Sequence, residues 1–225
     1  MANQNRAIEF GLLLSLPAAV ALWLLSDPII RVLFERGRFG PEDTLRTASA
    51  LAAFAVGLPA FVLVKALTPG FFAREDTRTP LYIAVFSIAV NIVLNVVFLY
   101  GTTLAQVGIA LATSLSGWLN ALLLAAVLHR RGHWIADARL NTRALRMIAA
   151  TIGMGAALWL ALFLLAPLIA QADIKGALVF AGICVLGVVV YAALGAVLGV
   201  VRLSELRFVM RRQPGVRSVD PGEQP

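Results

Sequence analysis

The amino-acid sequence predicts an all-α integral membrane protein with six transmembrane helices. Of the 225 residues, 60% are hydrophobic and only 14% are charged, which leaves too few polar side chains to cover a soluble domain. The mean hydropathy is +0.86. The apolar residues form runs of bilayer length, and inside lipid such runs must be helical because each backbone N–H and C=O needs a partner within its own segment.

The first two spans are predicted at residues 10–30 and 47–73. Residues 10–26 carry no charge, and the apolar stretch continues beyond Asp27 and Pro28. This run is too long for the apolar part of a typical signal peptide, so we expect it to stay in the chain. Residues 47–64 are also uncharged, and the apolar pattern resumes after Lys65.

The next two spans come from one long uncharged stretch. Residues 79–128 contain no Lys, Arg, Asp or Glu, and as a single helix these 50 residues would be ~75 Å long. A hydrocarbon core is about 30 Å thick, so the stretch must fold back, and the turn-like cluster at residues 101–103 marks the reversal. Spans three and four are therefore predicted at 81–100 and 105–128, with spans five and six at 147–170 and 176–201.

The basic residues predict how the chain is oriented. Six spans place the N-terminus, two of the connections and the C-terminal segment on one side, which carries thirteen of the nineteen Lys and Arg residues. Five lie on the other side, and Lys65 lies within a span. Because cytoplasmic segments carry the excess of positive charge, we expect both ends of the chain in the cytoplasm. The thirteen are Arg6, Arg74, Arg78, Arg130, Arg131, Arg139, Arg143, Arg146, Arg202, Arg207, Arg211, Arg212 and Arg217.

The connection between spans one and two, residues 29–46, is predicted to be a hairpin at the outer surface. Gly40 breaks the chain, and Pro41 followed by Glu42 and Asp43 is typical of the first turn of a helix. A loop that contacts substrate is the alternative. We favour the capping hairpin because it accounts for these residues.

Composition also excludes several functions. The net charge is +7, yet the basic residues are confined to short segments between apolar runs, which indicates orientation signals and contacts with membrane lipids and not nucleic acid. Cys184, the single cysteine, cannot form an internal disulfide. No nucleophile elbow, zinc-binding helix motif or phosphate-binding glycine loop is present. We therefore expect no enzyme activity, no metal centre of that kind and no cofactor.

Polar side chains inside spans three and four form two faces. Ser87, Asn91 and Asn95 are spaced i, i+4, i+8, while Thr113, Ser116 and Asn120 are spaced i, i+3, i+7. The short turn between the spans makes them antiparallel neighbours, so the oxygens of Asn91, Asn95 and Thr113 could converge. Neutral oxygens at membrane depth suit a small hard cation such as Na⁺. Hydrogen bonds that hold the two helices together are the alternative, and we favour them from the residues alone.

Lys65 is the ionisable side chain that lies well inside a predicted span. It could line a polar cavity and attract an anionic substrate. It could equally extend toward the cytoplasmic surface, because its span ends near residue 73.

Two blocks of sequence resemble a known family. The first runs from Leu13 to Leu22 and on to the segment Leu33–Phe39, and the second joins Gly57–Lys65 to Pro69–Pro80, ending in FFAREDTRTP. Both are similar to the C-terminal part of the MviN/MurJ family, the lipid II flippases of bacterial cell-wall synthesis. The last two spans match only in their hydrophobic pattern.

The resemblance implies a fold and an activity. Family members have fourteen helices, in two six-helix lobes followed by two further helices, so this chain would correspond to helices nine to fourteen. Residues 1–130 would supply four helices of the second lobe, residues 131–201 the two additional helices after a basic cytoplasmic loop, and residues 202–225 a basic, disordered cytoplasmic tail. The implied activity is transfer of lipid II, an undecaprenyl-linked peptidoglycan precursor, from the inner to the outer leaflet of the bacterial cytoplasmic membrane by alternating access.

Some family members also bind Na⁺ as a coupling ion in the second lobe. The resemblance carries that site to Asn91, Asn95 and Thr113, with a backbone carbonyl near Ile109. Some members have a carboxylate in this region, whereas this sequence has asparagine at both candidate positions.

The main departure from the family is length, because the first lobe is absent. We expect either a fragment or a mis-started reading frame, or a chain that needs a partner supplying the N-terminal lobe. The alternatives to a lipid II flippase are a membrane scaffold that does not transport, and a flippase for another polyprenyl-linked glycan.

Overall fold

The computed structural model describes residues 2–102, 104–135, 137–169 and 174–199. The described residues form helices joined by short connections, and six of the helical segments are long and apolar enough to cross a membrane. This confirms the predicted all-α fold with six spans. The helices are α1 (Ala2–Leu24), α2 (Ser26–Phe34), α3 (Pro41–Leu67), α4 (Pro69–Phe72), α5 (Arg78–Gly101), α6 (Ala105–Arg130), α7 (Ala138–Ile169) and α8 (Ile174–Val197).

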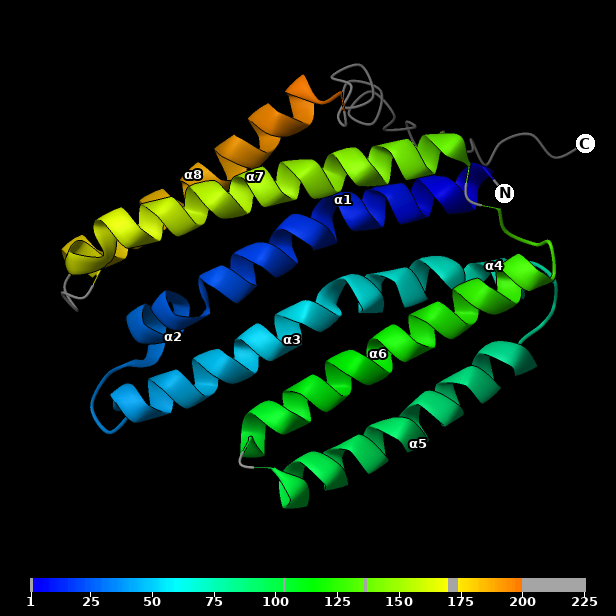
Figure 1. The fold of residues 1–225 in the computed structure, drawn as a ribbon, viewed down its shortest axis with the longest axis horizontal. Coiled ribbons are helices and arrows are strands. Elements are labelled where there is room, and N and C mark those ends of the chain that lie inside the picture. The colour runs from blue at the N-terminus through cyan, green and yellow to red at the C-terminus, as the bar shows by residue number, and fades with distance from the viewer. Residues whose placement is uncertain (1, 103, 136, 170–173, 200–225) are drawn as a thin grey trace, which may run out of the picture.

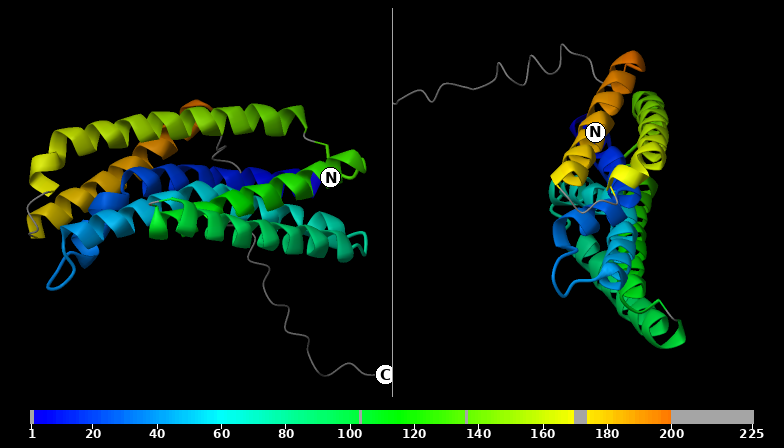
Figure 2. Two further views of the ribbon diagram at one scale, coloured as in Figure 1. Left: turned by 60° about the horizontal axis from the view of Figure 1, so that its bottom comes forward. Right: turned by 90° about the vertical axis from the view of Figure 1, so that its left-hand side faces the viewer.

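The spanning helices lie side by side in a row in the order α5, α6, α3, α1, α7, α8 (Figure 1). Each helix packs mainly against its neighbours in this row, while the short helix α2 packs against α3 and touches α8. The end-on view of Figure 2 shows how narrow the row is. Because α5 and α8 lie at its two edges, each packs mainly against one long helix, α6 and α7 respectively.

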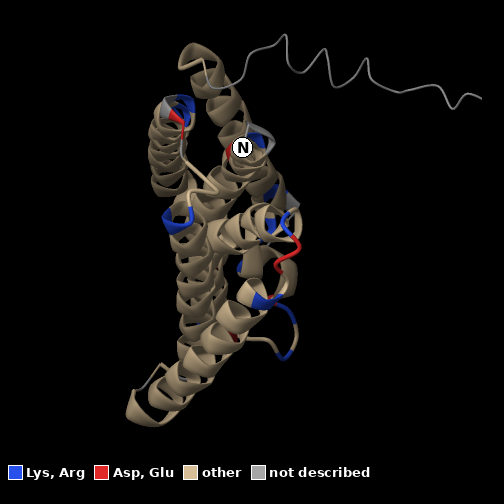
Figure 3. Ribbon diagram, turned by 90° about the vertical axis from the view of Figure 1, so that its right-hand side faces the viewer, with Lys and Arg blue, Asp and Glu red and all other residues tan. Residues whose placement is uncertain are grey.

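The outward faces of the row are apolar. In α5, for example, Val85, Phe86, Ile92 and Val93 are all more than half exposed, and long stretches of the helices carry neither colour in the charge view of Figure 3. A soluble protein would not expose such a surface, whereas lipid favours it.

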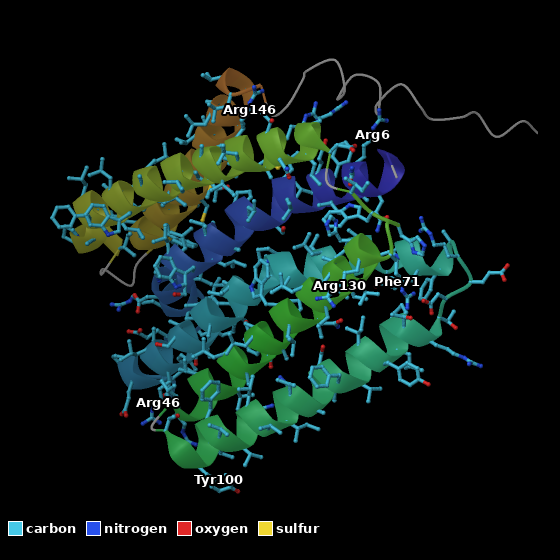
Figure 4. All side chains as sticks on the ribbon, turned by 45° about the vertical axis from the view of Figure 1, so that its right-hand side comes forward. Arg6, Arg46, Phe71, Tyr100, Arg130 and Arg146 are labelled. Carbon is cyan, nitrogen blue, oxygen red and sulfur yellow. The ribbon has the colours of Figure 1, made fainter. Side chains whose placement is uncertain are left out.

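The two ends of the row differ in charge. We call the end at which α1, α5 and α7 begin the basic end; Arg6, Arg130 and Arg146 lie there, whereas Arg46 and Tyr100 lie at the opposite end (Figure 4). The sequence predicted this separation from the number of spans and the positions of the arginines.

Two predicted boundaries are wrong, for one physical reason. Span one was expected to begin at residue 10 and span five at residue 147, yet α1 begins at Ala2 and α7 at Ala138. Arg139, Arg143 and Arg146 are therefore helical and the basic loop is shorter than expected. Charged residues were read as the ends of the spans, but helices continue into the interface where such residues find partners.

The first turns of α1 and α7 pack against each other at the basic end. The carboxylate of Glu9, only 7% exposed, lies 2.8 Å from Arg143 and 3.8 Å from Arg139. The Trp134 indole donates to Asn5 Oδ1 over 2.7 Å, and the Asn5 amide donates to the Ile135 carbonyl over 3.2 Å. These contacts explain how α1 and α7 stay helical beyond the apolar runs.

The α2–α3 connection shows the predicted capping contacts. The Gly40 N–H donates to the Asp43 carboxylate over 3.1 Å, and Pro41 begins the helix. The Thr44 hydroxyl, almost fully buried, donates to Glu35 Oε2 over 2.8 Å. Gly37 has φ +62°, a conformation that other residues adopt at a cost.

Helices α3 and α6 approach each other closely at Gly57. A Cβ placed on Gly57 would lie 2.6 Å from the Ser114 hydroxyl oxygen and 2.9 Å from the Ser114 Cα. Across the same contact, Ser114 Oγ donates to the Ala53 carbonyl over 2.7 Å. Small residues that bring backbones together are a common way to pack helices in membranes, and this contact sets the spacing of α3 and α6.

Residues 202–225, for which a disordered basic tail was expected, lie outside the described residues. The same holds for Val201, the predicted last residue of span six.

Candidate functional site

Helices α3, α5 and α6 line an open cavity of about 480 Å³. Its lining comes from three helical faces: Phe61, Val64 and Lys65 on α3; Ser87, Ile88 and Asn91 on α5; and Thr113, Ser116, Gly117 and Asn120 on α6. The spacings within each set are those of one face of a helix. The polar faces recognised in the sequence therefore point toward a shared space.

Asn91 connects α5 to α6 across this cavity. Its side-chain amide donates to Ser116 Oγ over 3.1 Å, and its Oδ1 accepts from the Asn95 amide over 3.0 Å. Hydrogen bonding between the helices, the interpretation favoured from the residues, is therefore present.

Thr113 and Ile109 belong to a separate pair. The Thr113 hydroxyl donates to the Ile109 carbonyl over 2.9 Å within α6. Thr113 lines the cavity, whereas neither Ile109 nor Asn95 is among the lining residues. The structure thus brings Asn91 together with Asn95 through a hydrogen bond and with Thr113 through the cavity, and leaves Ile109 to one side.

Two buried amide oxygens in this region have no hydrogen-bond partner among the described residues, Asn95 Oδ1 and Asn120 Oδ1. An unpaired buried oxygen is costly, so each can accept a donor or a cation. The oxygen atoms available as cation ligands are neutral, and no Asp or Glu lines the cavity. Such a set fits a monovalent hard cation such as Na⁺ better than a divalent ion, which prefers carboxylates.

Lys65 brings a positive charge to the same cavity. Its side chain is exposed and lines the space together with Ser87 and Asn91. Among the described residues no carboxylate forms an ion pair with it. A lysine with this environment can attract an anion.

Sequence reasoning missed the apolar wall of the cavity. A Cβ on Gly117 would lie 2.5 Å from Phe61 Cε1, so the absence of a side chain there leaves room for the Phe61 ring. Phe61 precedes Lys65 by one helical turn, so the sequence could have placed both side chains on the same face of α3. The sequence could not have shown that α6 approaches this face, because the approach depends on the distant contact between Gly57 and Ser114.

A second polar cluster lies at the basic end and joins two connections. Asp76 accepts hydrogen bonds from the Thr79 hydroxyl over 2.6 Å and the Thr79 N–H over 3.0 Å, and Arg131 lies 2.6 Å away. The Thr79 bonds, followed by the Arg131 contact, lower the pKa of Asp76 to about 2. This carboxylate therefore stays ionised at neutral pH and holds the α4–α5 connection to the residues that follow α6.

Comparison with known proteins gives a consistent result. The sequence profile of the family described as "Lipid II flippase MurJ" matches residues 1–175. A "Probable lipid II flippase MurJ" of Rhizobium meliloti (strain 1021) is 47% identical over 219 residues, which are 96% of this chain and 41% of that protein. A protein of the same description from Rhizobium tropici is 52% identical over 152 residues, or 68% of this chain and 28% of its own length.

A solved structure described as "Lipid II flippase MurJ, inward closed conformation" superimposes with a TM-score of 0.70 and 25% sequence identity. The match covers 92% of this chain and 39% of that one. The chain thus spans about two fifths or less of the length of the proteins it matches here.

Proposed function

The chain belongs to the MurJ family of lipid II flippases, and on that basis we propose that it forms the C-terminal part of a flippase for lipid II. Members of this family are membrane transporters and not enzymes. In the proposed activity, lipid II moves from the inner to the outer leaflet of the bacterial cytoplasmic membrane by alternating access.

The cavity between α3, α5 and α6 is the observation that carries the proposal. It places Lys65 beside neutral polar groups in a bundle whose outer faces are apolar. Lipid II pairs a charged diphosphate and polar sugars with a hydrocarbon tail. A polar cavity with one cationic side chain suits the head group, while the apolar outer faces suit the tail.

The proposed protein needs a second lobe. We assign residues 1–130 to four helices of one lobe, residues 131–201 to the two additional helices, and residues 202–225 to a basic tail. The partner is the N-terminal lobe of the family, which supplies the facing half of the central cavity. The basic end of the row then faces the cytoplasm, because arginines are enriched there.

Depletion of the gene that encodes this chain tests the proposed transport. We expect lipid II to accumulate in the inner leaflet, measured by its accessibility to an externally added lipid II-degrading enzyme. Unchanged lipid II flux would reject the flippase and favour a scaffold. Accumulation of a different polyprenyl-linked glycan would indicate a flippase for that glycan.

Lys65 provides a prediction for the purified chain. In nanodiscs, Lys65→Gln is expected to bind lipid II about fivefold more weakly, because one lysine charge near an anionic group contributes about 1 kcal/mol. Lys65→Arg should keep most of the affinity, since it retains the charge. Lys175→Gln, an exposed lysine at the start of α8, serves as the matched control. Equal affinities for Lys65→Gln and the unchanged chain would contradict the assigned role.

A Na⁺ site at Asn91, Asn95, Ile109 and Thr113 is the second candidate function, and the unpaired Asn95 Oδ1 supports it. When bound there, Na⁺ would supply a positive charge held by neutral oxygens. At ten times its dissociation constant, an ion stabilises the folded chain by about 1.4 kcal/mol. Replacing K⁺ by Na⁺ should therefore raise the melting temperature by about 3–6 °C.

The combined change Asn91→Ala and Asn95→Ala should remove that difference between the two salts. Asn141→Ala, an exposed asparagine in α7, is the control and should keep it. If the unchanged chain melts at the same temperature in both salts, this candidate site is wrong, and the lipid II proposal is unaffected.

A further inference from the structure

A proline in the first span removes one backbone hydrogen bond at membrane depth. Pro17 lies inside α1 and has no N–H, so the carbonyl of Leu13, one turn earlier, lacks its normal partner in the helix. In hydrocarbon an unpaired carbonyl costs free energy that water cannot recover. The structure must therefore supply a donor or leave a weak point in α1.

The donor comes from the last helix. The Tyr191 hydroxyl of α8 donates to the Leu13 carbonyl over 2.8 Å, across 178 residues of sequence. Helix α8 otherwise packs along α7 and touches α2. The hydrogen bond is thus a direct polar link between α8 and the site in α1 where the helix is weakest.

Two further hydroxyls lie in the same region. Ser15 in α1 and Thr151 in α7 are each 4% exposed, and the Ser15 hydroxyl oxygen has no hydrogen-bond partner among the described residues. Thr151 interacts with the Tyr191 hydroxyl. Neither Ser15 nor Thr151 donates to the Leu13 carbonyl, which among the described side chains accepts from Tyr191.

The proline in α3 is arranged differently. Pro59 lies inside α3 and leaves the Ala55 carbonyl without its helical donor, whereas the Trp118 indole of α6 donates over 3.0 Å to the next carbonyl, that of Val56. In α1, by contrast, Tyr191 meets the carbonyl that Pro17 itself leaves unpaired.

We infer that Tyr191 is a positioning residue that fixes the path of α1 at Pro17 and couples the α7–α8 pair to α1 and, through it, to α3 beside the cavity. The link fixes the path of α1 and hence of α3, which packs against α1 and carries Lys65. Its consequence for transport rests on the proposed function. The hydrogen bond itself does not, so it can be tested without transport.

A double-mutant cycle on the purified chain in detergent tests the inference. Cys184 is the single cysteine and lies partly buried against the α7–α8 core, so a thiol-reactive dye reports unfolding. Tyr191→Phe should lower the melting temperature by about 2–4 °C, the effect of one lost hydrogen bond. In a Pro17→Ala chain the residue 17 N–H can bond to the Leu13 carbonyl, so Tyr191→Phe should then have little effect.

The matched control is Ser15→Ala, which removes a nearby buried hydroxyl that has no partner among the described residues and should leave the melting temperature unchanged or slightly higher. An equal loss from Tyr191→Phe with and without Pro17 would overturn the inference, since it would show that the contribution of the hydroxyl does not depend on the carbonyl that Pro17 leaves unpaired.

A second measurement reports the path of α1 on the two sides of Pro17 directly. Spin labels at Arg6→Cys and Trp23→Cys in a Cys184→Ala chain lie on either side of Pro17, ~25 Å apart along the helix. Tyr191→Phe should broaden the distance distribution, and Pro17→Ala should narrow it again. A distribution that Tyr191→Phe leaves unchanged would also overturn the inference, whether or not the chain transports lipid II.

Discussion

Replacing Glu9 with glutamine is expected to lower the melting temperature of the purified chain by about 6–12 °C. The Glu9 carboxylate is buried and lies 2.8 Å from Arg143, whose side chain is 13% exposed. Glutamine keeps the size and one acceptor oxygen but loses the charge that faces two guanidinium groups. Breaking a buried ion pair costs about 3 kcal/mol, which corresponds to that shift for a chain of this size.

The control is Glu42→Gln, which breaks the Glu42–Arg46 pair at the start of α3. That pair is closer, at 2.6 Å, but its side chains are 64% and 78% exposed, so its contribution should be at most about 1 kcal/mol. Equal shifts for the two variants would mean that solvent screens Glu9 as fully as Glu42. The attachment of α7 to α1 would then have to come from apolar packing.

Replacing Gly57 with leucine is expected to separate α3 from α6. The first side-chain atom would already lie 2.9 Å from a backbone atom of Ser114, and no rotamer change relieves a backbone contact. Overpacking costs up to about 3 kcal/mol and a backbone clash lies at the upper end of that range, so the melting temperature should fall by about 6–12 °C. The cavity should also lose its shape, because α3 and α6 supply most of the lining, and the proposed binding of lipid II should be lost with it.

Three further variants keep this prediction testable if Gly57→Leu does not fold. Gly57→Ala should destabilise the chain less, and adding Ser114→Gly should recover part of that loss by removing the contacted side chain. Gly182→Leu in α8 is the control, since a Cβ there meets nothing within 4 Å. A stable Gly57→Leu chain with normal cavity function would contradict the close packing.

The six spans could be predicted because their length is set by the bilayer and not by tertiary contacts. The turn at residues 101–103 followed from the same argument, and α5 indeed ends at Gly101 while α6 begins at Ala105. The starts of α1 and α7 could not be predicted. They depend on the contacts of Glu9 and Asn5 with residues more than 120 positions away.

The candidate site, like the fold, could be predicted only in part from the sequence. Helical spacing was enough to place Asn91 on one face and Thr113 on another, and in the structure both residues line the cavity. Their hydrogen-bond partners could not be predicted from the sequence, because the Thr113 hydroxyl can donate to a carbonyl of its own helix, that of Ile109, instead of to α5. The position of Lys65 beside them needed the packing of α3 on α6.

The single-file order of the spanning helices has a mechanical consequence. Load applied to one helix passes to the far edge mainly through the intervening pairs in turn, while the Tyr191–Leu13 hydrogen bond and the contacts of α2 with α3 and α8 add a second route on the α8 side. Parting α3 from α6 around Gly57 would separate the α5–α6 pair from α3 there, while the two sides stay joined at the basic end, where Leu67, Phe71 and Leu128 share one core cluster. The Gly57–Ser114 contact is therefore the place at which the α5–α6 pair could swing away from α3 about the basic end.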